Sequence, residues 1–135
     1  MCTSFNLRKA SRAITQFYDD ALRDSGLKST QFSLLAAAAT AGALPITRLA
    51  EEMAMDRTTL TRNLKPLEDG GLIRIEAGHD RRVRRVSLTP DGEAALERAL
   101  PLWRKVQTGL IDRMGDQRWG DLLRNLQAAR RAAQE

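Results

Sequence analysis

The chain has 135 residues and a formal net charge of +5 at pH 7; 42% of its residues are hydrophobic and 29% are charged. This length and composition are typical of one folded globular domain. One cysteine, Cys2, and one histidine, His79, cannot form an internal disulfide or a Cys/His metal cluster, so we expect no metal, no cofactor and no enzyme. The chain has neither an apolar run of about 20 residues nor the apolar core of a signal peptide, which predicts a cytoplasmic protein without membrane contact.

The first part of the chain predicts two helices. Apolar residues recur at spacings of three and four from about 6 to 24, which is typical of an amphipathic helix, and Gly26 ends it. Ser29 or Thr30 is expected to cap a second helix over 30–41, which is apolar nearly all round and should therefore be buried.

The next segment predicts a helix-turn-helix. Leu44–Ile46 should form a short extended edge, and Thr47 should cap a helix over 48–53. After a gap of two residues, Asp56 should cap another helix over 57–69. Pro66 lies within this second helix and is expected to bend it rather than break it.

A β-hairpin and two long helices complete the chain. Apolar residues over 72–75 and 83–88 predict two strands joined by a polar tip at 77–82. Helices are then expected from Pro90 to about Met114, with a bend at Pro101, and over about 117–133. The predicted fold class is mainly α with a small β-hairpin: a winged helix-turn-helix over about 30–89, flanked by dimerisation helices over 5–25 and 90–134 in a single unit.

Basic residues are concentrated in the middle of the chain. Residues 57–85 carry eight basic and four acidic side chains, whereas residues 1–56 are neutral and residues 86–135 carry a net charge of +1. A local basic patch on a neutral body indicates a polyanionic partner, with a solvated charged loop as the alternative.

The helix over 57–69 and the hairpin that follows carry residues suited to DNA. Arginine can pair with guanine in the major groove, threonine can contact a phosphate or a thymine methyl, and an arginine on the wing can enter the minor groove. Four arginines crowd the hairpin, and Asp80 is expected to hold Arg82 in position. The predicted DNA-binding residues are Arg57, Thr58, Thr59, Thr61, Arg62, Lys65, Asp80, Arg81, Arg82 and Arg84.

These residues resemble the MarR family of bacterial regulators. The segments TRLAEEMAMDRTTLTRNLKPLEDGGLI and HDRRVRRVSLTPDG carry the resemblance, and the pattern D-x-R-x-x-x-V-x-L-T is met from Asp80 to Thr89. The resemblance implies a homodimer joined by its first and last helices, which binds a pseudo-palindromic operator and usually represses. It also implies that Arg82 enters the minor groove. The apolar surface for such a dimer is expected among Leu7, Ile14, Trp103, Val106, Leu110, Trp119, Leu122 and Leu126, some of which must instead line the core of the monomer.

Two sensing routes are implied by the same resemblance. Peroxide-sensing relatives share the segment SRAITQFY at 11–18 and one tyrosine, Tyr18, but their cysteine aligns with Ser4, two residues from Cys2. Cys2 is either the redox sensor or an incidental N-terminal thiol. The other route is a small aromatic acid held by Arg12, Phe17, Tyr18, Phe32 and Trp103, unless these residues form plain core.

The predicted function is therefore a sequence-specific regulator that binds double-stranded DNA as a homodimer and is released by a small ligand or by thiol oxidation. The alternative is an architectural protein that binds DNA with low sequence specificity. Its affinity for DNA would depend on the salt concentration but not on the DNA sequence. A protein-binding winged helix is disfavoured by the arginine cluster, because the cores of protein interfaces are poor in charge.

Overall fold

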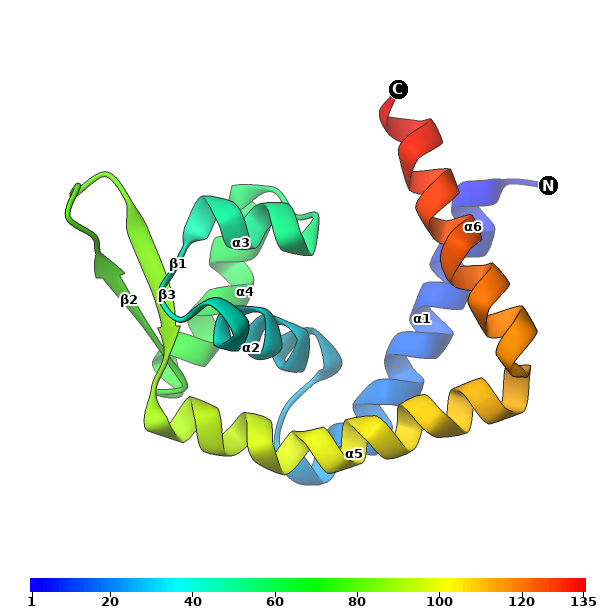
Figure 1. Ribbon diagram of the computed structural model, residues 1–135, viewed down its shortest axis with the longest axis horizontal. Helices are drawn as coiled ribbons and strands as arrows, with labels where there is room; N and C mark the ends of the chain where they lie inside the picture. The colour runs from blue at the N-terminus through cyan, green and yellow to red at the C-terminus, as the bar shows by residue number, and fades with distance from the viewer.

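The computed structural model describes residues 1–135 apart from the side chain of Ala41. The elements in chain order are α1 (Thr3–Leu22), the 3-10 helix η1 (Arg23–Ser25), α2 (Ser29–Ala41), β1 (Leu44–Pro45), α3 (Ile46–Met53), α4 (Arg57–Asp69), β2 (Ile73–Ala77), β3 (Arg84–Leu88), α5 (Pro90–Met114) and α6 (Asp116–Gln134). In Figure 1, α2, α3, α4 and the sheet gather at one end of α5, α6 rises from the other end, and α1 meets α5 near its middle. This arrangement confirms the predicted winged helix-turn-helix with flanking helices.

Local hydrogen bonds define the start of α2. The cap is Lys28 rather than the predicted Ser29 or Thr30, because the side-chain oxygen of Gln31 accepts from the Lys28 N–H at 2.9 Å. The Ser29 N–H donates to the carboxylate of Asp19 at 2.7 Å, which places a negative charge from α1 at the positive end of the α2 dipole. This bond ties α1 to the winged part of the chain.

The helix-turn-helix consists of α3 and α4. The predicted cap at Thr47 is wrong by two residues: Pro45 occupies the cap position with a φ of −58° and an extended ψ of 140°, and α3 begins at Ile46. Ala54 ends α3 in the left-handed region, at a φ of 52°. Asp56 caps α4 as predicted, and α4 continues past Pro66 to Asp69.

The wing belongs to a three-stranded antiparallel sheet in the order β1-β3-β2. The register pairs Ile75 with Val86, and the edge strand β1 pairs Leu44 with the same Val86. Leu72 and Val83, expected in the strands, lie just outside them, because the Leu72 N–H closes the end of α4 on the Leu67 carbonyl and the Val83 N–H closes the hairpin tip on the Asp80 carbonyl.

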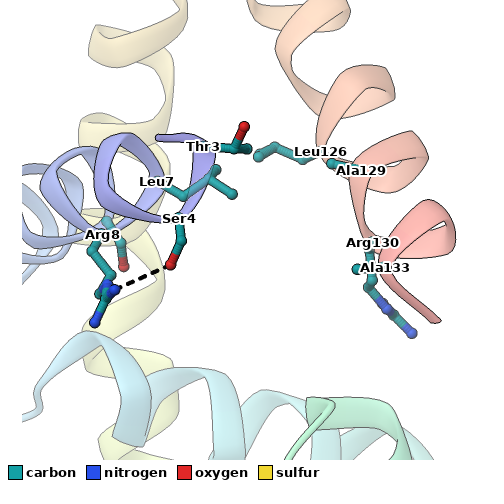
Figure 2. A pocket seen from close by; sticks show the side chains of 9 residues that line it. Thr3, Ser4, Leu7, Arg8, Leu126, Ala129, Arg130 and Ala133 are labelled. Atoms are coloured by element: carbon teal, nitrogen blue, oxygen red, sulfur yellow. Dashed lines mark hydrogen bonds between the residues drawn. The ribbon is translucent and has the colours of Figure 1, made fainter. Parts of the chain in front are cut away.

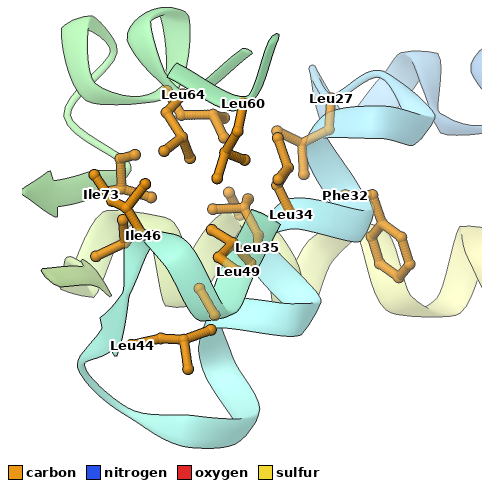
Figure 3. Packing of buried hydrophobic residues seen from close by; sticks show 14 of the residues in the cluster. Leu27, Phe32, Leu34, Leu35, Leu44, Ile46, Leu49, Leu60, Leu64 and Ile73 are labelled. Atoms are coloured by element: carbon orange, nitrogen blue, oxygen red, sulfur yellow. The ribbon is translucent and has the colours of Figure 1, made fainter. Parts of the chain in front are cut away.

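The hydrophobic core lies where α2, α3, α4 and the sheet meet the first half of α5 (Figure 3). Three leucines of α4, Leu60, Leu64 and Leu67, are buried in this core. Burial of one leucine side chain contributes about 1.5–3 kcal/mol, so these residues fix the orientation of α4. Ala95 and Ala99 of α5 are also buried, and their small side chains let α5 approach closely. The largest fully buried side chains are Leu22, Leu34, Leu35, Leu49, Leu60, Leu64, Leu67 and Val86.

The remaining helices extend away from this core. α5 continues past Pro101 to Met114 and contacts both α1 and α6. None of the residues of α6 is buried. Over the described residues, no helix is both long enough and apolar enough to cross a membrane.

Candidate nucleic-acid interface

One face of α4 collects five of the predicted DNA-binding residues. Leu60, Leu64 and Leu67 point into the core, so the other side of the helix is left to solvent. This exposed side forms an open hollow lined by Arg57, Thr58, Thr61, Arg62 and Lys65. A helix that presents arginine, lysine and threonine on one exposed face has the donors that base edges and phosphates accept.

The charges on this face are only partly compensated. Lys65 lies 3.5 Å from the carboxylate of Asp69, an exposed pair that contributes little to stability. Among the residues that the structure describes, neither Arg57 nor Arg62 forms an ion pair. The Thr61 hydroxyl donates to the Arg57 carbonyl at 2.9 Å, which leaves its lone pairs toward solvent.

The N-terminus of α4 is held by Asp56. Its carboxylate accepts from the Thr59 N–H at 2.7 Å and from the Thr59 hydroxyl at 2.9 Å. These two bonds, with a smaller contribution from the Arg62 charge, lower the pKa of Asp56 below its ordinary value. Thr59 is thus engaged in the cap and lies apart from the hollow that its neighbours line. The spacing Asp-x-x-Thr is a sequence signal that could have separated Thr59 from the other threonines.

The hairpin tip exposes three arginines. Arg81, Arg82 and Arg84 are exposed, and within the described part of the chain none of them forms an ion pair. Asp80 orders the tip through the backbone, because its carboxylate accepts from the Arg82 N–H at 3.0 Å rather than from the guanidinium. Asp80 therefore holds the position of Arg82 while its guanidinium stays available.

Arg85 behaves differently from the other arginines of the wing. It is half-buried, and its Nη1 donates to the Ala43 carbonyl at 3.3 Å, which links β3 to the connection between α2 and β1. The Arg85 side chain passes close to Gly78, because a Cβ added at Gly78 would lie 3.0 Å from the Arg85 Nε. Arg85 thus anchors the wing, which its sequence alone did not indicate.

The wing and α4 belong to one continuous unit, since α4 packs against β2 and only Gly70–Leu72 separates them. Against this geometry, a sequence model described as the MarR family matches residues 25–83. The transcriptional regulator MosR of M. tuberculosis in complex with DNA is 41% identical and superposes with a TM-score of 0.92 over 99% of this chain and 97% of that one. The chain belongs to the MarR family of DNA-binding transcriptional regulators.

Other proteins similar to the chain are also named as transcriptional regulators. A probable transcriptional regulator from Pseudomonas aeruginosa is 30% identical, with a TM-score of 0.81 over 94% of this chain and 95% of that one. An HTH-type transcriptional regulator of Bacillus anthracis is 34% identical over 97 residues, which cover 72% of this chain. The chain spans about two thirds of the length of such curated relatives, 65% in this case. These relatives are named as regulators of transcription, not as enzymes.

A cavity of about 260 Å³ lies where the MarR resemblance implies a ligand pocket. Phe32 and Trp103 stack in it with ring centroids 5.7 Å apart, and Tyr18 joins them at the wall. Phe17 and Arg12 do not line it: the ring of Phe17 lies under the Arg113 guanidinium at 5.3 Å, and Arg12 is exposed. Thr15, Ser29 and Ser33 line the cavity instead, which the sequence reasoning missed.

Tyr18 joins two helices beside this cavity. Its hydroxyl donates to the side-chain carbonyl of Gln107, so it connects α1 to α5. Burial raises the pKa of Tyr18 above its ordinary value, and the phenol stays protonated as a donor. Tyr18 therefore belongs both to the wall of the cavity and to the contact between α1 and α5.

The predicted redox pair is not brought together within the chain. Cys2 is exposed at the start of α1, whereas Tyr18 lies near its end, about 24 Å away along the helix axis. The Arg8 guanidinium donates to the Ser4 hydroxyl at 3.1 Å, and the Lys9 ammonium lies over the Phe5 ring at 5.5 Å. These two basic side chains of α1 thus contact Ser4 and Phe5.

Proposed function

We propose that this MarR-family chain is a sequence-specific regulator that holds double-stranded DNA between the exposed face of α4 and the arginines of the wing. The observation that supports this proposal is that both surfaces belong to one unit and carry arginines that form no ion pair among the described residues, namely Arg57 and Arg62 on α4 and Arg81, Arg82 and Arg84 on the wing. Arginines this close together repel one another unless an anion neutralises them. MosR, whose backbone superposes on nearly the whole chain, was crystallised with DNA.

In this proposal the two surfaces have different tasks. Arg57, Thr58, Thr61, Arg62 and Lys65 face the major groove, which is wide enough for a helix and carries the distinguishing base edges. Arg82 enters the adjacent minor groove, where the negative potential attracts a guanidinium, and Arg81 and Arg84 contact phosphates. Residues 30–89 would then form the DNA-binding part.

The active form is proposed to be a homodimer. The large exposed apolar side chains beyond Met1 are Phe5, Leu7 and Ile14 on α1 and Leu122, Leu123 and Leu126 on α6, between 36% and 56% exposed. Figure 2 shows Leu7 and Leu126 on either side of an open hollow of about 820 Å³ between these helices. A second copy would cover this surface with its own α1 and α6, because self-complementary patches are the rule in two-fold dimers.

A two-fold dimer sets the form of the operator. In such a dimer α4 is the recognition helix of each copy. The two α4 helices are related by the two-fold axis and bind half-sites one helical turn apart, so the operator is proposed to be pseudo-palindromic. By occupying it in the cytoplasm, the regulator would act as a repressor.

Release is proposed to follow from a single-ring aromatic acid in the cavity between Tyr18, Phe32 and Trp103. Its volume of about 260 Å³ is near the lower end for ligand pockets, and its aromatic walls and hydroxyls suit a small polar ring. Salicylate is a suitable probe, with Trp119 replaced by phenylalanine so that Trp103 reports alone. We expect salicylate to quench Trp103 and to release DNA; unchanged fluorescence and binding would exclude this route.

Thiol oxidation at Cys2 is the other proposed route, since the thiol is exposed and an oxidant can reach it. If Cys2 is the sensor, peroxide should release DNA from the native protein and leave the Cys2→Ser variant bound. A Cys2→Ser variant that responds like the native protein would remove Cys2 from the mechanism.

The DNA assignment is tested with Arg82→Ala. The variant should lose about 1–3 kcal/mol of affinity for a selected palindromic duplex while remaining a folded dimer. Arg23→Ala is the matched control: it removes the same charge from an exposed arginine that pairs with Asp20 at 2.7 Å, outside the proposed surface. Equal affinity for Arg82→Ala and the native protein would refute the role of the wing.

A gel-shift titration against the palindrome and a scrambled duplex separates a regulator from an architectural protein. A regulator should favour the palindrome by about 10³-fold or more, whereas a protein that contacts only phosphates should bind both alike.

A further inference from the structure

The end of α4 meets the start of α5 in an unusually close backbone contact. Gly92, in the first turn of α5, lies directly on the Leu72 carbonyl. A Cβ at Gly92 would lie 2.9 Å from the carbonyl carbon of Leu72 and closer still to its oxygen. Because the obstacle is backbone, no side chain could rotate to make room, and any larger residue must separate α5 from this turn.

Thr89 fastens the same contact with three hydrogen bonds. Its N–H donates to the Leu72 carbonyl at 3.1 Å, and its hydroxyl donates to the Gly71 carbonyl at 2.6 Å. The same hydroxyl accepts from the Gly92 N–H at 3.1 Å, which caps α5. One side chain thus serves as the cap of α5 and as its link to the turn after α4.

The turn itself is fixed to α4. The N–H groups of Gly70, Gly71 and Leu72 donate to the carbonyls of Pro66, Glu68 and Leu67 at 3.0, 3.0 and 2.9 Å. The turn is therefore hydrogen-bonded to the last turn of α4, with no flexible segment between them. We call Gly71, Leu72, Thr89 and Gly92 the α4–α5 joint.

The position of this joint gives small changes a large effect. The proposed reading residues start at Arg57, at the opposite end of α4. A rotation of about 5° at one end of a helix about 20 Å long moves its other end by about 2 Å. Hydrogen bonds to bases lose most of their strength over such a shift.

We propose that Thr89 and Gly92 are positioning residues that set the angle between the recognition helix and α5, and with it the separation of the two recognition helices on DNA. This proposal rests on the proposed function, since the separation has a meaning only in a DNA-bound dimer. According to this proposal, the α4–α5 joint determines which spacing between the two half-sites the protein can bind.

The experiment measures affinity as a function of half-site spacing. A palindromic duplex selected by the native protein is lengthened or shortened by one and two base pairs at its centre. The native protein should show a sharp optimum. Gly92→Ala should lower the affinity at that optimum by about tenfold or more, the size of losing one base-pair contact, and should shift or broaden the optimum.

Two controls separate positioning from stability. Gly109→Ala adds the same methyl group to α5 where no atom lies within 4 Å, and it should keep the native profile. Thr89→Val removes both hydroxyl bonds and should broaden the optimum, whereas Thr89→Ser keeps the hydroxyl and should restore it. The Thr89 variants also decide the question if Gly92→Ala does not fold.

The outcomes are distinct. A uniform loss of affinity with an unchanged optimum in Thr89→Val would show that the joint serves stability only and would overturn the proposal. If the native protein itself prefers no duplex or spacing, the proposed function fails instead.

Discussion

Arg84 and Arg85 are neighbours in β3 with different environments. Side chains alternate along a strand, so Arg84 is exposed while Arg85 turns back toward Ala43. Two adjacent arginines therefore have different roles: Arg84 is a proposed phosphate contact, and Arg85 anchors the wing.

This difference predicts two distinct salt responses. Arg84→Ala should reduce the slope of log affinity against log salt concentration by about 1, the loss of one phosphate contact. Arg85→Ala should leave the slope unchanged and accelerate hydrogen exchange at the Gly78 and Val83 amides of the hairpin, because the anchor is lost. Each variant is the control of the other, and equal slopes for both would contradict the division of roles.

The sequence was sufficient to predict which segments form the site, but not the directions in which their side chains point. Residue type and spacing identified the basic helix and wing, and the cap Asp56 was correct. Phe17 and Tyr18 are adjacent in α1 and point about 100° apart, and only Tyr18 lines the cavity. The bond of Thr59 to Asp56 follows from the spacing Asp-x-x-Thr, whereas the bond of Arg85 to Ala43 joins residues 42 positions apart and has no local sequence signal.

At the scale of the element, α4 depends on the charge of its cap. Hydrogen bonds from Thr59 hold the pKa of Asp56 below its ordinary value of 3.8, so the ionised form stabilises the folded state. This contribution is fully present above pH 3.8 and is lost as the pH falls through the lowered pKa.

The cap can be tested with Asp56→Asn, which keeps an oxygen acceptor but does not titrate. The native protein should have the higher unfolding temperature at pH 7, and the difference should narrow as the pH falls below 3.8. The measurement is thermal unfolding followed by circular dichroism across this range. A difference that stays constant with pH would contradict the role of the charge.

The elements followed from periodicity and turn residues, and so did the ends of α4 and α5, whereas the starts of α2 and α3 did not. The predicted cap of α3 at Thr47 was two residues late, since Pro45, which pairs with Arg85 of β3, is the cap. A pairing between segments about 40 residues apart has no local sequence signal.

At the scale of the whole molecule, the surfaces proposed for DNA and for the second copy lie on different helices. Leu126→Glu should give a monomer, because a carboxylate would be buried in the dimer interface, while the winged unit keeps its core. Loss of bivalent binding should lower DNA affinity by about 10²–10⁴. Sedimentation and DNA titration measure both effects.

Gln127→Glu is the matched control for this prediction. It adds the same carboxylate one residue further along α6 at an exposed position that does not line the hollow. The control should remain a dimer with native affinity, and a Leu126→Glu variant that does the same would place the interface elsewhere.

The apolar faces of α1 and α6 also determine how this regulator would respond to its own abundance. Where the protein is scarce enough for the proposed dimer to dissociate, occupancy of an operator rises with the square of the number of copies, by mass action. A twofold fall in synthesis then lowers occupancy about fourfold, so dilution during growth would itself lift control of the target genes.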